Sequence, residues 1–362
     1  MKSILFFARL PLSEEEKMDG EIQRVLLIDE MARAENFNRI YIHLDFRSFI
    51  NIIYEPKFLK NARAYSLSVY RIKSWSLVVK LIKNSDVTYF HSLHNYKFSF
   101  FFKYWLKNTF RIIDFHGIVP EENLFLGNRI RSFVYGLIEK LNIHSFDAYI
   151  CVSMSMINFY REKYQLKKDK CHLLPMVRNN DYELITDLND IYRKDLNIPS
   201  YKPVVIYVGN CQKWQNIDLM MDAIEAINKD VFLIILSAQQ DEFLKIIRKK
   251  KITKQILLKS VEHSELVKYY AVANYGFLLR DDHPVNNVAN PTKLVEYLQF
   301  GLVPIVLSTN TSDIDFMEVD TISLEDFPHS ALACTKNQHN IDIYNNFYDS
   351  SKYKLSKIIS NE

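Results

Sequence analysis

Apolar and polar positions follow two different rhythms along the chain. Uninterrupted apolar runs of about four to eight residues, the length of a strand buried on both faces, are separated by segments with apolar residues at helical spacing. The helical rhythm is clear at 21–34, 74–84 and 292–300. The predicted strands are 3–8, 39–44, 64–70, 86–92, 111–115, 146–152, 170–175, 203–208, 231–237, 255–260, 275–279 and 302–307. Alternation of this kind in both halves predicts an α/β fold, with two doubly wound Rossmann-like domains and a cleft between them.

The length of 362 residues allows two domains of ordinary size. A linker is predicted near 176–181, because the segment that follows it is polar and Pro199 and Pro203 then precede a new strand. We therefore expect an N-terminal domain at 1–178, a C-terminal domain at 179–338 and a last segment, 339–362, that is partly helical.

Composition narrows the class of protein. The chain is 48% apolar and 25% charged, as in folded soluble proteins, and its net charge of +3 is too small to indicate a nucleic acid partner. The cysteines at 151, 171, 211 and 334 have no metal-binding spacing and are expected to be reduced thiols. The N-terminal apolar run is short for a signal peptide, and no run approaches the roughly eighteen residues of a membrane span. We expect a cytoplasmic protein.

The most informative stretch is 277–306, FLLRDDHPVNNVANPTKLVEYLQFGLVPIV. A strand leads into a polar loop, Pro291 stands where a helix can begin, and Gly301 is placed to end that helix before the next strand. The loop and the helix N-terminus are predicted at the carboxyl end of the sheet. Ligands of doubly wound folds bind at this edge, and helix-terminal N–H groups suit a phosphate.

The part PTKLVEYLQFGLVPIV resembles the nucleotide-sugar site of retaining GT-B glycosyltransferases, glycosyltransferase family 4. The resemblance implies that Glu296 binds the ribose hydroxyls of the sugar donor. The family's second glutamate, eight positions earlier, is replaced by Val288. The hydroxyls of the donor sugar must then meet other groups, of which Asn286, Asn287 and Asn290 are the nearest.

The strand at 203–208 runs into Gly209 and Asn210, where the family has a Gly-Arg pair. The positive charge that the family's arginine places beside the donor diphosphate is therefore missing at Asn210. We expect Lys213, Lys293 or Arg280 to supply it. The resemblance thus implies a site that binds the sugar donor, with residues Gly209, Asn210, Arg280, Asn290, Pro291, Thr292 and Glu296. The nucleotide is expected to be UDP rather than GDP. No Asp-x-Asp motif follows a strand, so catalysis without a metal or other cofactor is expected.

In the first half, DFHGIVPEE resembles the family motif whose histidine lies near the transferred sugar. His116 is accordingly expected to be catalytic, together with Lys213 and Lys293, although a lone histidine is more often structural. On the acceptor side the expected residues are Gly20, Arg24 and Glu121. For the segment around Gly20, a plain connection between strand and helix is an equal alternative, and Glu121 also suits the first turn of a helix for electrostatic reasons.

The segment 96–111, YKFSFFFKYWLKNTFR, interleaves large aromatics with lysines and arginine. It is predicted to be helical, either as a core helix with solvated lysines or as a helix at the inner face of an anionic membrane.

The resemblance implies transfer of a hexose from a nucleotide sugar to a glycan or lipid-linked acceptor in polysaccharide biosynthesis, with retention of anomeric configuration. It also implies that the last helix packs back on the first domain. The alternatives are an epimerase or hydrolase of the same fold, or a non-catalytic protein that binds a partner. A dinucleotide-dependent oxidoreductase is disfavoured because no strand is followed by GxGxxG.

Overall fold

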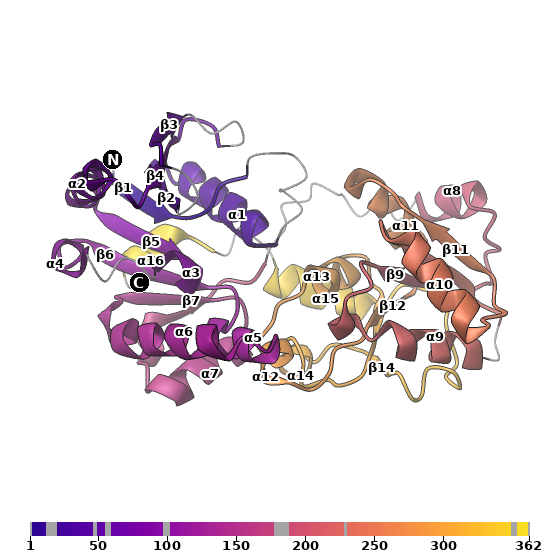
Figure 1. Cartoon of the computed structure of the whole chain (residues 1–362). Coiled ribbons are helices and arrows are strands. Elements are labelled where there is room, and N and C mark those ends of the chain that lie inside the picture. The colour runs from indigo at the N-terminus through magenta and orange to yellow at the C-terminus, as the bar shows by residue number, and fades with distance from the viewer. Residues whose placement is uncertain are drawn as a thin grey trace. The chain divides into compact units, whose positions relative to one another are not determined.

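The computed structural model describes residues 2–11, 20–45, 49–54, 59–96, 102–176, 188–227, 230–348 and 353–360. The chain folds into two compact units (Figure 1). The first consists of Met1–Val177 together with Ser350–Glu362, and the second of Arg178–Asp349. Among the described helices none is long and apolar enough to cross a membrane.

The described strands of the first unit form an eight-stranded sheet in the order β3-β4-β2-β1-β5-β6-β7-β8. All pairs are parallel except β3 with β4. The strands are β1 Ser3–Phe7, β2 Asn38–Asp45, β3 Ile52–Tyr54, β4 Arg63–Ser68, β5 Val87–His91, β6 Phe110–Phe115, β7 Ala148–Cys151 and β8 Cys171–Leu173. The short edge strand β3 was missed by the sequence reading.

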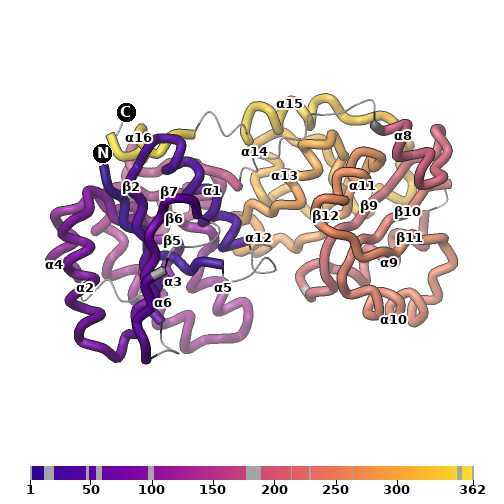
Figure 2. Tube along the Cα trace, turned by 90° about the horizontal axis from the view of Figure 1, so that it is seen from above, coloured from indigo at the N-terminus to yellow at the C-terminus, as the bar shows by residue number. Residues whose placement is uncertain are grey.

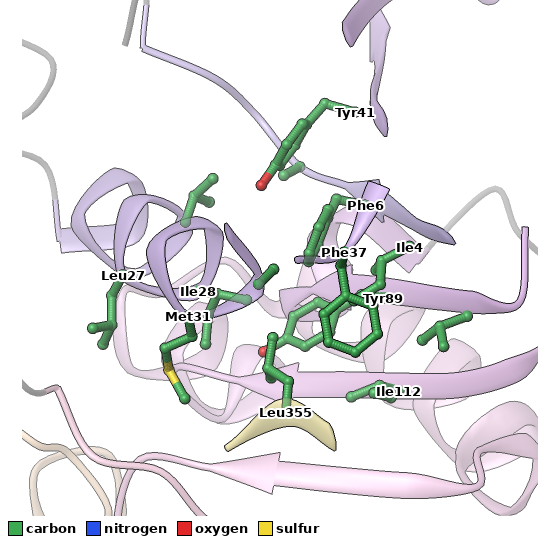
Figure 3. Packing of buried hydrophobic residues seen from close by; sticks show 14 of the residues in the cluster. Ile4, Phe6, Leu27, Ile28, Met31, Phe37, Tyr41, Tyr89, Ile112 and Leu355 are labelled. Carbon is green, nitrogen blue, oxygen red and sulfur yellow. The ribbon is translucent and has the colours of Figure 1, made fainter. Parts of the chain in front are cut away.

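The helices of the first unit are α1 Gly20–Ala34, α2 Ile72–Lys83, α3 Ser92–Tyr96, α4 Lys103–Leu106, α5 Val119–Phe125, α6 Arg129–Asn142, α7 Met154–Tyr164 and α16 Leu355–Ser360. On one face of the sheet, α1 and α16 pack on the strands (Figure 3). Figure 3 shows Ile28 and Met31 of α1 and Leu355 of α16 gathered around Phe6 and Tyr89. The opposite face carries stacked Phe7 and Phe90. Strands buried on both faces explain why their sequence is apolar throughout rather than alternating.

In the second unit the described strands form a six-stranded sheet in the order β11-β10-β9-β12-β13-β14. All of its pairs are parallel. The strands are β9 Val204–Val208, β10 Phe232–Leu236, β11 Ile256–Lys259, β12 Tyr275–Leu278, β13 Val303–Val306 and β14 Ile322–Ser323. The helices are α8 Leu188–Asp195, α9 Ile217–Ala226, α10 Gln240–Lys250, α11 Leu266–Val272, α12 Pro284–Asn287, α13 Thr292–Gln299, α14 Ile314–Met317 and α15 Gln338–Phe347.

Two apolar clusters cover the two faces of this second sheet. One joins β9 to α11, α13 and α15, and the other joins β9 to α9 and α10. Helix α13 ends where it was predicted to end, since Gly301 has a φ of 62° in the left-handed region that favours glycine. The doubly wound arrangement positions the carboxyl ends of β9 and β12 and the start of α13 at one edge of the sheet.

Two predictions about segments are corrected by the structure. Residues 339–362 do not act as one unit, because α15 packs in the second unit through Ile343, whereas α16 belongs to the first (Figures 1 and 2, yellow). There Glu35 accepts hydrogen bonds from the backbone N–H groups of Leu355 and Ser356, at 2.6 and 2.9 Å, and so caps the start of α16.

The segment 96–111 is not one helix. Residues 97–101 lie outside the described part of the chain, α4 covers only Lys103–Leu106, and β6 begins at Phe110. Tyr96 and Phe102 are buried, and Phe102 lies against Trp75 with 5.3 Å between ring centroids. These two aromatic side chains therefore belong to the core of the first unit.

Candidate functional site

The loop after β9 lies close to the first turn of α13. At Gly209 the φ angle is 149°, a conformation that side chains rarely allow. A Cβ at this position would lie 3.0 Å from Lys293 Nζ and 3.1 Å from the Tyr207 hydroxyl. The glycine therefore permits a close approach between the β9 loop and the Lys293 side chain.

Among the described residues, no carboxylate forms an ion pair with Lys293. Its Nζ donates a hydrogen bond to Gln215 Oε1 at 2.7 Å and lies 4.4 Å from the centroid of the Tyr207 ring. Burial, reinforced by the nearby Arg280 guanidinium, lowers the pKa of Lys293 to about 7, although Glu296 acts in the opposite direction. An anion bound here would supply the missing negative charge and favour the protonated amine.

Arg280 follows β12 and is the second cation of this edge. Its buried Nε has no hydrogen-bond partner among the described residues, and burial lowers its pKa. Buried polar groups without partners are rare and cost free energy. Together, Arg280 and Lys293 form a half-buried cation pair beside a glycine loop. We call Gly209, Arg280 and Lys293 the cation site.

Glu296 lies one turn further into α13 and is only 6% exposed. Its Oε2 accepts a hydrogen bond of 2.7 Å from the hydroxyl of buried Tyr270. The carboxylate is thus held in one orientation. Val288, which replaces the family's other glutamate, is buried and contributes no polar group.

The remaining residues of the predicted site occupy varied environments. Pro291 is the N-cap of α13, and its side chain makes no capping hydrogen bond. Thr292 and Lys293 open the helix. The Asn290 side chain donates to the hydroxyl of Tyr348 at 2.9 Å, which ties it to the end of α15. In the loop after β9, the backbone carbonyl of Asn210 accepts a hydrogen bond of 2.7 Å from the Tyr207 hydroxyl. The side chain of Lys213 lies outside the described part of the chain.

In the first unit, a buried charged network surrounds the carboxyl end of β6. Asp114 receives hydrogen bonds from Arg24 Nε at 2.9 Å and Nη2 at 3.0 Å, and a third from the Tyr89 hydroxyl at 2.7 Å. Burial alone would raise the pKa of Asp114, but Arg24 and then His116 outweigh it and hold that pKa well below its usual range. The carboxylate is therefore ionised throughout the physiological range.

His116 lies at the end of this network. Its Nε2 is 3.2 Å from Asp114 Oδ2, and its side chain is 15% exposed. A second histidine, His91, is fully buried, with its Nδ1 3.7 Å from the same oxygen. Burial lowers the pKa of His91 well below its ordinary value, so it is neutral at pH 7. His116 is the partly exposed member of the pair, although both of its ring nitrogens are buried and have no hydrogen-bond partner among the described residues. Asp114 lies close enough to its Nε2 to favour one orientation of the ring.

His91, Asp114 and His116 also have the side chains of a metal site, with ligand atoms within 4.8 Å of one another. Arg24, however, contacts both oxygens of Asp114. A divalent ion at Asp114 would face this guanidinium at close range, and like charges at such a distance repel strongly. We therefore interpret the group as a charged support for His116, whose Nε2 lies 3.2 Å from Asp114 Oδ2, rather than as a metal site.

This network also corrects one prediction for the acceptor side. Arg24 is fully buried, and its Nη1 donates to the carbonyl of Pro175 at 2.9 Å. It supports the histidine and is not available to an acceptor. Glu121 forms an ion pair of 2.8 Å with Lys163. Gly20 begins α1 and is exposed, whereas residues 12–19 before it lie outside the described part of the chain.

Residues 189–313 match the family model described as Glycosyl transferases group 1. The chain carries a glycosyltransferase group 1 domain. The matched residues lie within the second unit, and they include the cation site and Glu296. No curated protein matches this chain in sequence.

The whole chain has the GT-B fold of known glycosyltransferases. It is similar to sucrose-phosphate synthase from Thermosynechococcus elongatus, with a TM-score of 0.69 and 13% identity over 99% of this chain and 97% of that one. It is also similar to HepE from Anabaena in complex with UDP-glucose, with a TM-score of 0.60 and 13% identity over 100% and 93%. A third is WaaG, a glycosyltransferase of lipopolysaccharide biosynthesis, with a TM-score of 0.60 and 12% identity over 99% and 98%. At such low identity these likenesses establish the fold.

The predicted GT-B fold is thus confirmed, and the roles of the individual residues stay predictions. Sequence reasoning missed the groups that hold the predicted ones in place: Gln215, Tyr207 and Tyr270 in the second unit, and His91, Tyr89 and Asp114 in the first. Of these, Asp114 carried a usable signal, since it precedes His116 by two residues at the end of a strand.

Proposed function

We propose that the glycosyltransferase domain transfers a hexose from a nucleotide-diphosphate sugar, with UDP as the nucleotide, to a hydroxyl group of a glycan or lipid-linked acceptor. The observation that carries this proposal is the cation site. Two half-buried cations, neither ion-paired with a carboxylate in the part of the chain that the structure describes, lie beside a glycine loop and a helix N-terminus. A diphosphate is the common ligand whose size and charge match such a site.

The cation site suits the chemistry of transfer. As the bond between the sugar and the diphosphate breaks, negative charge grows on the departing diphosphate. Preorganised cations in a site of low polarity stabilise that growing charge more than they stabilise the bound substrate. Lys293 and Arg280 would supply this stabilisation without a metal ion, and His116 is proposed to contact the reacting sugar. Glu296, held by Tyr270, is proposed to bind the ribose.

Similar proteins support the finer parts of the proposal. HepE has been seen with UDP-glucose and with UDP and glucose, which favours a UDP-hexose. WaaG acts in lipopolysaccharide biosynthesis, which favours a cell-surface glycan as acceptor and a cytoplasmic location at the inner face of the membrane. Retention of configuration rests on the sequence resemblance to glycosyltransferase family 4.

The test is release of UDP from a UDP-hexose with and without a lipid-linked glycan acceptor. Release that depends on the acceptor, with sugar recovered on it, supports transfer, and the anomeric configuration of the product tests retention. Release at the same rate without acceptor indicates a hydrolase. If nucleotide binds and no UDP is released under either condition, the protein is a binding module and the proposed transfer is wrong.

A further inference from the structure

Helix α6 in the first unit has its apolar side facing the solvent. Ile130, Phe133, Val134, Leu137 and Leu141 recur at the spacing that gathers side chains on one side of a helix. All five are exposed, Ile130 by 81% and Phe133 by 74%. We call these five residues the α6 apolar face. In Figure 1, α6 lies on the viewer's side of the first unit, with no other element of that unit drawn in front of it.

Polar contacts fix this orientation from the other side of the helix. Glu139, 1% exposed, accepts hydrogen bonds from Lys163 at 2.7 Å, from Tyr164 at 2.7 Å and from Tyr160 at 3.2 Å. Rotating α6 to bury its apolar face would bring Glu139 out of these contacts and leave buried Tyr160 and half-buried Tyr164 without this acceptor. The contacts of Glu139 therefore hold the apolar face of α6 toward the solvent. Exposed apolar surface of this extent marks an interaction site.

The charges around the α6 apolar face have one sign. Among residues 119–144, the exposed side chains with a permanent charge are Arg129, Arg131 and Lys140. On the helix, Arg129 and Lys140 lie on one flank of the apolar face and Arg131 lies on the other. The nearby carboxylates of Glu121 and Glu139 are both paired with Lys163, at 2.8 and 2.7 Å. Within residues 119–144, the exposed permanent charges on the rim of the α6 apolar face are therefore positive.

We propose that the α6 apolar face docks the protein onto an anionic lipid bilayer. An apolar helix face with cations on its flanks is the pattern of a helix that lies in the plane of the membrane interface. Each cation near such a surface gains from the negative lipid headgroups. A second copy of the chain fits less well, because a twofold contact through this face would bring the cations of both copies together. The inference does not depend on the proposed transfer reaction.

Vesicle sedimentation of the full chain tests the proposal. The wild-type protein is expected to pellet with phosphatidylcholine vesicles that contain phosphatidylglycerol, and far less with phosphatidylcholine alone. The variant Ile130→Ser with Phe133→Ser removes the two most exposed side chains of the α6 apolar face, and it should need at least about tenfold more lipid for half-binding. Neutralising Arg129, Arg131 and Lys140 to glutamine should weaken binding about fivefold per residue at low salt.

The matched control is Ile72→Ser with Tyr104→Ser. These side chains are 87% and 75% exposed on α2 and α4, beside the aromatic segment that the sequence marked for membrane contact. The control variant is expected to bind vesicles as the wild type does. Unchanged circular dichroism and melting temperature establish that each variant is folded.

Three results would overturn the proposal. The first is wild-type protein that stays in the supernatant with anionic vesicles at low salt. The second is an Ile130 and Phe133 variant that binds as tightly as the wild type. The third combines two observations: analytical ultracentrifugation shows a dimer for the wild type and a monomer for the Ile130 and Phe133 variant, and neither protein binds vesicles. This result would assign the α6 apolar face to contact between two copies of the chain.

Discussion

The titration of Lys293 gives the sharpest test of the cation site. In the free protein its pKa is lowered to about 7, so the amine loses its charge as the pH rises through neutrality. A bound diphosphate brings negative charge next to Nζ and raises that pKa. Binding above pH 7 therefore takes up one proton, and affinity must fall as the pH rises.

The size of the effect follows from the pKa of the free lysine. The observed dissociation constant scales with one plus the ratio of neutral to charged lysine, as long as the bound lysine stays protonated. Between about pH 6 and pH 8 this factor rises by about tenfold, equivalent to roughly 1.4 kcal/mol. Below the free pKa the affinity levels off. An ordinary exposed lysine would show no change in this range, because its pKa is near 10.4.

Calorimetric titration with a UDP-hexose measures both the affinity and the number of protons taken up on binding. The diphosphate of a nucleotide sugar is esterified at both ends and keeps its charge over this range, so the ligand does not contribute. Titrations at pH 8 in buffers of different ionisation enthalpy should report uptake of close to one proton. Lys293→Arg is the control, because a guanidinium stays charged and should remove the pH dependence while retaining binding. Wild-type affinity that is flat between these pH values would refute the reasoning.

Three further predictions concern other groups of the two units. Glu296→Gln should weaken binding of a nucleoside diphosphate by roughly 1.5–3 kcal/mol, the contribution of a charged hydrogen bond, and Tyr270→Phe should weaken the same binding less. If calorimetry finds no change in affinity for Glu296→Gln, Glu296 does not bind the ribose. Asp114→Asn should lower the turnover number for transfer by leaving His116 without the ionised carboxylate 3.2 Å from its Nε2, whereas a lower melting temperature with an unchanged turnover number would indicate a purely structural role. Leu355→Ala should destabilise the first unit by about 2–5 kcal/mol, because Leu355 is fully buried in its core, and chemical denaturation with a midpoint like that of the wild type would contradict this.

Much of the fold was predictable from the sequence because all strand pairs but β3 with β4 are parallel among the described strands. Strands such as Val204–Val208 and Tyr275–Leu278 are covered by helices on both faces, so an uninterrupted apolar run identifies them. The short edge strand Ile52–Tyr54 escaped because it is antiparallel and two of its residues, Ile52 and Ile53, are exposed. Its three residues carry too little pattern to separate it from a loop.

Helix α6 shows a different limit. Its apolar residues have the spacing of an ordinary core helix, and periodicity states which side chains share a side of the helix without stating which side is buried. The direction is decided by Glu139 and its partners Lys163, Tyr160 and Tyr164, which lie more than twenty residues away in sequence. Only the folded chain brings them together.

In the candidate site too, local sequence patterns could be predicted and contacts between distant residues could not. Gly209, Lys293 and Glu296 were predicted because the residues around them resemble known motifs, and the structure places Gly209 close to Lys293. The support around His116 was missed because Arg24 and Asp114 are ninety positions apart, and no local pattern links them. Arg24 was consequently assigned to the acceptor when it is buried beneath the histidine's carboxylate partner.

The central claim is that the cation site holds the diphosphate of the sugar donor. A crystal structure of the protein with a UDP-hexose bound tests it directly. We predict phosphate oxygens at hydrogen-bonding distance, about 3 Å, from Lys293 Nζ and the Arg280 guanidinium, with the backbone of Gly209 alongside. A diphosphate bound elsewhere, with Lys293 still donating to Gln215 and Arg280 Nε still without a partner, would contradict it.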